Sequence, residues 1–180
     1  DEAQKQIEKL SGNIISLQDV LTDKRSRGAF GEIQLSNILK TLFGENNKKV
    51  YEEQYILPNG MRVDCILHLP EPLGDISIDS KFPLESYQKI FNSDLPEVER
   101  LKAKRQFKSD VKKHIDDIKS KYILSSSTSN QAIMFLPSEA IFSEINAYHE
   151  DIIAYSQKNN VWITSPTTLM SMLTTVQVVL

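Results

Sequence analysis

Two aspartates and a lysine lie in the stretch RVDCILHLPEPLGDISIDSKFP, residues 62–83, whose composition is otherwise typical of buried strands. Side chains two residues apart in a strand share a face, so Asp79 and Lys81 are expected to project together. If the strands that carry Asp64 and Asp79 are neighbours, the two carboxylates repel each other and raise one pKa unless a cation lies between them. Mg²⁺ is commonly held by carboxylates, waters and substrate phosphate oxygens. An ion pair of Lys81 with either aspartate at a strand end accounts for the same residues.

The segment RGAFGEIQLSNIL supplies a third carboxylate upstream. Apolar spacing predicts a helix from Gly28 to Leu42 with one buried face. Gly28 and Gly31 are poor helix formers, by about 1 kcal/mol each against alanine, and are expected where another backbone or a substrate comes close. Glu32 either stabilises this helix start through the dipole or joins the two aspartates as a ligand.

Basic residues gather at two places in the sequence. Lys24, Arg25 and Arg27 directly precede the glycines, a position that suits contact with nucleic-acid phosphates. A second set recurs at helical spacing between residues 96 and 122, but aspartates interrupt it and a solvated helix face explains it. His114, in that helix, is expected to be a partly buried packing residue. His68 is expected either at a turn end or in support of the Asp64 side chain.

Turn residues divide the rest of the chain into elements. The signals PNG and PEPLG separate three strands at residues 51–57, 61–69 and 75–82, which predicts an antiparallel meander. A long helix from about residue 96 to 122, a buried strand at 131–137, a helical segment at 138–160, a strand at 161–165 and a helix capped by SPTT complete the order. This order predicts one α/β domain whose meander is joined by helical crossovers to parallel strands. Phe135 and Trp162 are both expected in the core.

The first 23 residues carry an apolar seam at spacings of three and four, namely Ile7, Leu10, Ile14, Leu17 and Leu21. About two heptads fit either the end of a longer coiled coil or an amphipathic helix packed on the domain. We therefore divide the chain into a coiled-coil-like helix at 1–23 and an α/β domain at 24–180. The start without methionine and the apolar ending TTVQVVL indicate a fragment of a longer protein.

The composition restricts the class of protein and the partners that it can bind. The chain has 180 residues, 40% hydrophobic and 25% charged, with a net charge of −3, which fits one soluble globular domain and gives no global attraction to nucleic acid. Any nucleic-acid contact must come from local basic clusters. The single cysteine, Cys65, rules out an internal disulfide framework and suits a reducing compartment. No motif for a small-molecule cofactor is evident.

The combination of a helix carboxylate, a strand aspartate and an Asp-x-Lys element resembles the PD-(D/E)XK nuclease superfamily. That resemblance implies a restriction-endonuclease-like mixed sheet with the core order helix, three-strand meander, helix, strand. It implies that Asp64, Asp79 and Glu32 bind one or two metal ions, that the Ser80 backbone carbonyl is a further ligand, and that Lys81 assists hydrolysis. The usual proline before the strand aspartate is replaced here by Val63.

Longer segments are similar to the RmuC family, among them NGMRVDCILHLPEPLGDISIDSKFPLE, FKSDVKKHIDDIKSKY and VWITSPTTLMSML. This resemblance covers essentially the whole chain. It implies a nuclease-like domain behind a long coiled coil, DNA as the partner, a role in limiting rearrangement at inverted repeats, and often a membrane-proximal N-terminus.

Three functional hypotheses follow. The first is a deoxyribonuclease dependent on Mg²⁺ (or Mn²⁺), gripping DNA with Lys24, Arg25 and Arg27. It would act in the bacterial cytoplasm near the nucleoid, homo-oligomeric through the coiled coil and tethered to the membrane by a segment outside this sequence. The second is a non-catalytic DNA-binding or scaffolding domain. The third is a metal-dependent hydrolase of another phosphoester.

Overall fold

The computed structural model describes residue 3 and residues 23–180. The predicted coiled-coil seam between residues 7 and 21 lies outside the described residues. The elements, in chain order, are α2 (Lys24–Phe43), β1 (Tyr51–Ile56), β2 (Arg62–Leu67), β3 (Ile76–Ser80), α3 (Leu84–Ile90), α4 (Glu97–Tyr122), β4 (Ala132–Phe135), α5 (Glu139–Tyr148), α6 (Glu150–Lys158), β5 (Val161–Thr164) and α7 (Pro166–Val179). In this part of the chain, no helix has both the length and the apolar content needed to cross a membrane.

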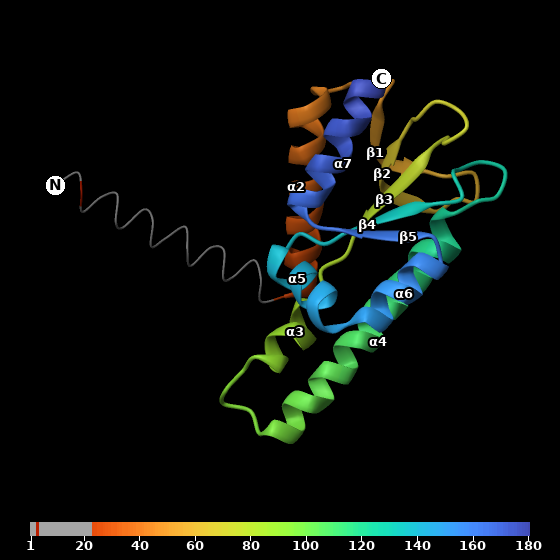
Figure 1. Ribbon diagram of the computed structural model, residues 1–180. Coiled ribbons are helices and arrows are strands. Elements are labelled where there is room, and N and C mark those ends of the chain that lie inside the picture. Colours follow the sequence, from red (N-terminus) through yellow and green to blue (C-terminus); the bar gives the residue numbers. More distant parts are fainter. Residues whose placement is uncertain (1–2, 4–22) are drawn as a thin grey trace.

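The strands form a mixed sheet in the order β1-β2-β3-β4-β5 (Figure 1). The first three pair antiparallel, with Tyr51 opposite Leu67 and Cys65 opposite Ile78. β4 and β5 are parallel to β3 and to each other. A meander requires only short turns, whereas a parallel neighbour requires a crossover, which α3 and α4 provide between β3 and β4. The predicted α/β order, with a meander followed by parallel strands, is confirmed.

Helices cover both faces of the sheet (Figure 1). One face packs on α2 and α7, through buried residues such as Leu39 and Leu169. The other packs on the helices of the crossovers, with Phe107, Val111 and Ile115 of α4 fully buried. Strand residues alternate between the two cores, so a polar side chain on β2 or β3 is held at a fixed depth against one helix layer.

Three local predictions need correction. α2 begins at Lys24, four residues before the predicted start at Gly28, because the Asp23 carboxylate caps the helix by accepting from the Ser26 N–H at 2.9 Å. The helical segment 138–160 is broken at His149 into α5 and α6. Trp162 is 45% exposed, not in the core, because β5 is an edge strand.

Candidate metal and nucleic-acid site

Asp64 and Asp79 are cross-strand neighbours. Cys65 pairs with Ile78 in the antiparallel β2–β3 ladder, so the residues just beyond them, Asp64 and Asp79, also face each other. Directly opposite side chains in such a ladder lie within contact distance. The Ser80 backbone N–H donates to Asp64 Oδ2 at 2.8 Å, which fixes that carboxylate against the end of β3. The predicted side-by-side placement of the two aspartates is confirmed.

Both carboxyl groups hold protons more tightly than free aspartates. Burial and, after it, the neighbouring Asp64 charge raise the pKa of Asp79 to about 7, against the opposing charge of Lys81. Burial also raises the pKa of Asp64, against the hydrogen bond from the Ser80 N–H. The two side chains hydrogen-bond to each other, with Asp79 as the donor. The pair thus shares a proton, which is the electrostatic response of adjacent buried carboxylates without a cation.

Lys81 forms the ion pair that the spacing allowed. Its Nζ lies 3.1 Å from Asp79 Oδ2, and both side chains are largely shielded from solvent. The Lys81 backbone N–H donates to the Phe135 carbonyl at 2.9 Å, extending the β3–β4 pairing by one residue. The ion pair and the carboxylate pair therefore coexist, since Asp79 contacts a carboxyl group on one side and an ammonium group on the other.

The start of α2 packs directly on this end of β3. A Cβ on Gly31 would collide with the Ser80 hydroxyl and lie 3.3 Å from Pro137 Cγ, so the close approach predicted for a glycine holds at this position. Glu32, the next residue, is exposed and hydrogen-bonds to Asp64, whose pKa its charge also raises. The helix glutamate thus contacts one aspartate.

The donor set fits a divalent cation at the two aspartates, because such an ion would replace the shared proton and remove the repulsion. Each aspartate already commits one oxygen, Asp64 to the Ser80 N–H and Asp79 to Lys81. Within residues 23–180 no group of three or more aspartate, glutamate, histidine or cysteine side chains is arranged to hold a metal ion. The expected convergence of Glu32 with both aspartates around one ion is therefore absent from the described residues.

A cleft of about 530 Å³ opens beside Lys81, between the first turns of α2 and the middle of α4. Lys24, Arg27 and Gly28 line it from α2. Arg27 is buried and Lys24 is exposed, while Arg25, also exposed, is not among the lining residues. Two of the three predicted DNA-gripping residues therefore share a cleft with the predicted catalytic lysine.

The position of His114 at this cleft was not predicted from the sequence. The residue was expected to be a packing residue, yet it lines this cleft from α4 together with Lys113. Burial and, after it, the nearby Lys81 charge lower the pKa of His114 to about 4. The available signal was a polar stripe with helical periodicity on α4, formed by Asp110, Lys113, His114 and Asp117.

The other two histidines have structural partners. His68 does not support Asp64, because its Nδ1 lies 3.0 Å from Asp75 Oδ1 and its Nε2 lies 2.7 Å from Glu52 Oε2. Burial lowers its pKa, but the bonds to the two carboxylates outweigh that effect and raise it overall. His149 is fully buried at the α5–α6 break, with Nε2 at 3.3 Å from Glu144 Oε1.

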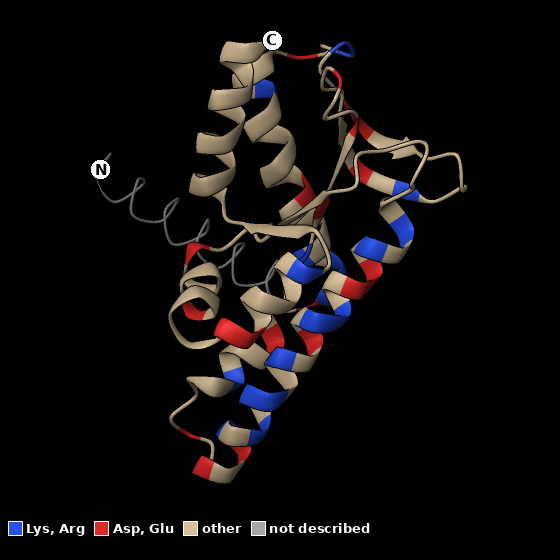
Figure 2. Ribbon diagram, turned by 45° about the vertical axis from the view of Figure 1, so that its right-hand side comes forward, with Lys and Arg blue, Asp and Glu red and all other residues tan. Residues whose placement is uncertain are grey.

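The basic stripe of α4 alternates with acidic residues (Figure 2). Lys108 and Lys112 both reach Asp151 of α6, at 3.2 and 3.7 Å, and Lys119 donates to Asn159 at 3.0 Å. These lysines connect α4 to α6 at the surface, as expected if the stripe is a solvated helix face and not a nucleic-acid contact.

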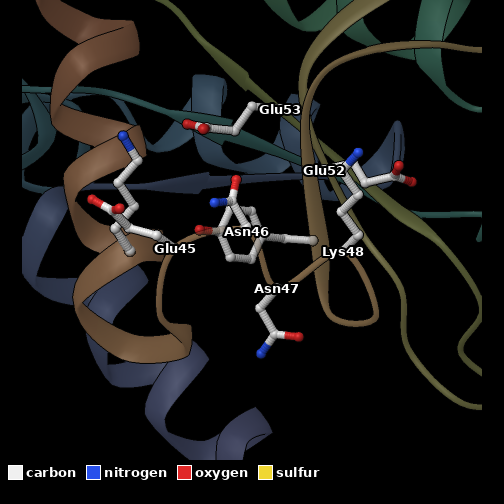
Figure 3. Close-up of a pocket in the computed structure, with 8 residues that line it drawn as sticks. Glu45, Asn46, Asn47, Lys48, Glu52 and Glu53 are labelled. Atoms are coloured by element: carbon white, nitrogen blue, oxygen red, sulfur yellow. The ribbon is translucent and has the colours of Figure 1, made fainter.

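A second polar hollow lies away from the aspartate pair, where the α2–β1 loop meets β1 (Figure 3). Glu45, Asn46 and Glu53 line it with Lys48 and others. Its side chains are mostly exposed and come from the last turn of α2, the loop that follows it and the start of an edge strand. The hollow brings together no buried charged group comparable to Asp79.

The fold and this site define a mixed α/β domain in which a buried and a half-buried aspartate pair across neighbouring strands, next to a lysine. The chain belongs to the RmuC family, whose model matches residues 1–180.

Curated relatives agree with this assignment. The chain is similar to the DNA recombination protein RmuC homolog of Xylella fastidiosa (28% identical, 96% of this chain and 39% of the relative) and to that of Chlamydia pneumoniae (32%, 89% and 37%). It is also similar to DNA recombination protein RmuC of Escherichia coli K12 (29%, 86% and 33%). The chain therefore spans less than two fifths of the length of these relatives. No solved structure matched the chain.

Proposed function

We propose that residues 24–180 form a DNA nuclease domain of restriction-endonuclease-like type, dependent on Mg²⁺ or Mn²⁺, that hydrolyses phosphodiester bonds during recombination or rearrangement control. The relatives named as DNA recombination proteins support DNA as the substrate. The cleft beside Lys81, lined by Lys24 and Arg27, supports contact with a phosphate backbone.

One observation carries the proposal, namely the pairing of buried Asp79 with half-buried Asp64 beside Lys81. Burying adjacent carboxylates is unfavourable, and apolar residues at the same positions would stabilise the sheet more. The Asp79 side chain is only 6% exposed, and its pKa of about 7 leaves it near half-ionised at neutral pH. Such strongly perturbed groups beside a cleft are typical of functional sites.

In such a reaction the residues of the site would have distinct roles. A bound divalent cation would polarise the scissile phosphate and lower the pKa of an attacking water. Asp64 and Asp79 would hold the ion, Glu32 would adjust Asp64 through their hydrogen bond, and the Ser80 carbonyl would complete the protein ligands. Lys81, fixed by Asp79, would orient the water or stabilise charge that develops on the phosphate.

A non-catalytic DNA-binding or scaffolding domain is the second candidate. It is favoured by the lack of a three-carboxylate cluster in the described residues and by the engagement of Lys81 with Asp79. Under this alternative the aspartate pair is structural, and DNA binding depends on the α2 cations alone.

A cleavage assay separates the two candidates. Purified protein is incubated with 5′-labelled single-stranded, duplex and hairpin DNA, and with RNA, in Mg²⁺, Mn²⁺ or EDTA. Asp79→Asn and Lys81→Met should each lower the metal-dependent rate by at least about 100-fold, the range seen when a transition-state contact is removed. Glu53→Gln, an exposed carboxylate on β1, is the matched control and should keep the wild-type rate.

Full metal-dependent cleavage by Asp79→Asn would refute the assignment. Binding without cleavage, persisting in EDTA and insensitive to Asp79→Asn, would support the scaffolding alternative. Hydrolysis of RNA or small phosphodiesters but not DNA would support a hydrolase of another phosphoester. Homo-oligomerisation through residues 1–23, and a cytoplasmic, nucleoid-associated and membrane-tethered location, belong to the same proposal and are tested by light scattering and cell fractionation of the full-length protein.

A further inference from the structure

The cleft beside Lys81 has a second wall on which His114 is the central residue. α4 supplies Lys113 and His114, and α2 supplies Lys24 and Gly28. His114 lies about midway along α4, where Val111 and Ile115 are fully buried, so its backbone position is fixed by the core. A side chain on such a rigid element can hold a ligand group precisely.

His114 is a polar group with no hydrogen-bond partner among residues 23–180. Neither of its ring nitrogens hydrogen-bonds to any residue that the structure describes, although the side chain is partly buried. A partly buried imidazole normally finds a donor or acceptor. Because burial and Lys81 keep it neutral, the ring offers one N–H donor and one acceptor nitrogen towards the cleft.

The charges around the cleft favour an anion. The acidic lining residues are engaged elsewhere: Asp110 accepts from Ser86 and Gln106, while Glu85 and Asp117 pair with lysines of their own helices. Lys24 and Lys113, in contrast, have no ion-pair partner within residues 23–180. Two available ammonium groups on opposite walls therefore face a ligand between α2 and α4.

Gly28 leaves the opposite wall open. A Cβ on this residue would meet no atom within 4 Å, so the space in front of the α2 backbone is unfilled. The cleft thus combines an open backbone wall, two available cations and a neutral hydrogen-bonding group next to Lys81.

We propose that this cleft seats a DNA strand next to the phosphate at the aspartates, and that His114 hydrogen-bonds to that strand as an uncharged positioning contact between Lys113 and Lys81. The inference rests on the proposed function for DNA as the ligand, but it does not require cleavage. A neutral contact and a cationic contact differ in a measurable way. Removing a phosphate-bound cation lowers the slope of log K against log salt by about 0.9 on duplex DNA, whereas removing a neutral hydrogen bond leaves the slope unchanged.

The test is fluorescence anisotropy with a labelled 20-base-pair duplex carrying a single-stranded tail, in EDTA, from 50 to 200 mM KCl. His114→Ala should weaken binding roughly 3- to 10-fold at every salt concentration, the range expected for one hydrogen bond, with the wild-type slope. Lys113→Ala and Lys24→Ala should each lower the slope by about 0.9. Ser109→Ala, an exposed neutral change on the same helix, is the control and should bind as wild type.

His114→Gln, which keeps a donor and an acceptor, should bind within about 2-fold of wild type and guards against a folding defect in the alanine variant. Unchanged affinity in His114→Ala, a changed slope in that variant, or no binding by the wild type at 50 mM KCl would each overturn the inference. Because EDTA abolishes any metal-dependent reaction, a failure to cleave DNA leaves this result unaffected. Conversely, if the wild type cleaves DNA and His114→Ala binds DNA as tightly as the wild type, the His114 contact is refuted while the proposed nuclease function stands.

Discussion

Asp79→Asn is expected to stabilise the protein, and by clearly more at pH 8 than at pH 5. Asparagine has almost the shape of protonated aspartic acid, so it mimics the form of Asp79 that the folded state prefers. The folded pKa, about 7, lies above the ordinary 3.8, so the folded protein binds this proton more tightly than the unfolded chain. Stability from Asp79 is therefore greatest below about pH 4 and is lost as pH rises through 7.

The magnitude follows from the same two values. The interval between 3.8 and about 7, at about 1.36 kcal/mol per pKa unit, corresponds to roughly 4 kcal/mol at alkaline pH. Relaxation and water entry around the ionised pair reduce this limit, so a gain of about 1 to 4 kcal/mol is expected for the variant at pH 8. At pH 5 the folded side chain is protonated but the unfolded chain, 1.2 pH units above 3.8, is already largely ionised, so the same arithmetic gives an upper limit of about 1.6 kcal/mol for the difference.

Urea denaturation at pH 5 and pH 8 measures this directly. Glu53→Gln, an exposed change that keeps Asp79, is the control, and its stability should change with pH as that of the wild type does. A second arm adds Mg²⁺ at pH 8. If the aspartate pair binds the ion, the wild type gains stability with concentration, by about 2.7 kcal/mol at 100 times the dissociation constant, and Asp79→Asn does not.

Equal effects of Asp79→Asn at the two pH values would show that the proton-sharing pair does not exist in solution. A loss of stability in Asp79→Asn at pH 8 would show that the ion pair with Lys81 stabilises the ionised Asp79 by more than burial destabilises it. Identical Mg²⁺ responses of wild type and variant would remove the basis for a cation at this site.

Other changes probe the fold around the site. Gly31→Ala should destabilise the protein by about 1 to 3 kcal/mol in urea denaturation, because the new methyl group collides with Ser80. Gly28→Ala, in the same helix with open space in front of it, should instead raise stability by up to about 1 kcal/mol. His68→Gln should destabilise more at pH 5.5 than at pH 8.5, since the raised pKa makes its stabilisation complete below the ordinary 6.5 and lost above the folded value. Ser165→Ala removes the capping box of α7 and should lower the thermal midpoint, at a cost of about 0.5 to 2 kcal/mol.

The features that the sequence predicted correctly depend on short-range patterns. Asp64 and Asp79 belong to consecutive strands joined by a short connection, so alternation and a meander suffice to place them together. Gly31 was expected at a close approach because its helix propensity is poor. The position of His114 was not predicted because its cleft is lined by residues of α2 and α4, which are more than 60 residues apart in the sequence and share no local pattern. Trp162 was misplaced since composition does not reveal which strand lies at the edge.

β3 is hydrogen-bonded on both sides, to the meander by β2 and to the parallel half by β4, and this restricts how the chain can vary in length. Insertions are tolerated where the backbone is exposed, such as the β1–β2 turn at Pro58 or the α3–α4 connection at residues 91–96. One residue added within β3 would turn Asp79 to the opposite face, because side chains alternate. We therefore expect RmuC sequences to differ in length at those loops and to keep an unbroken spacing from Ile76 to Lys81.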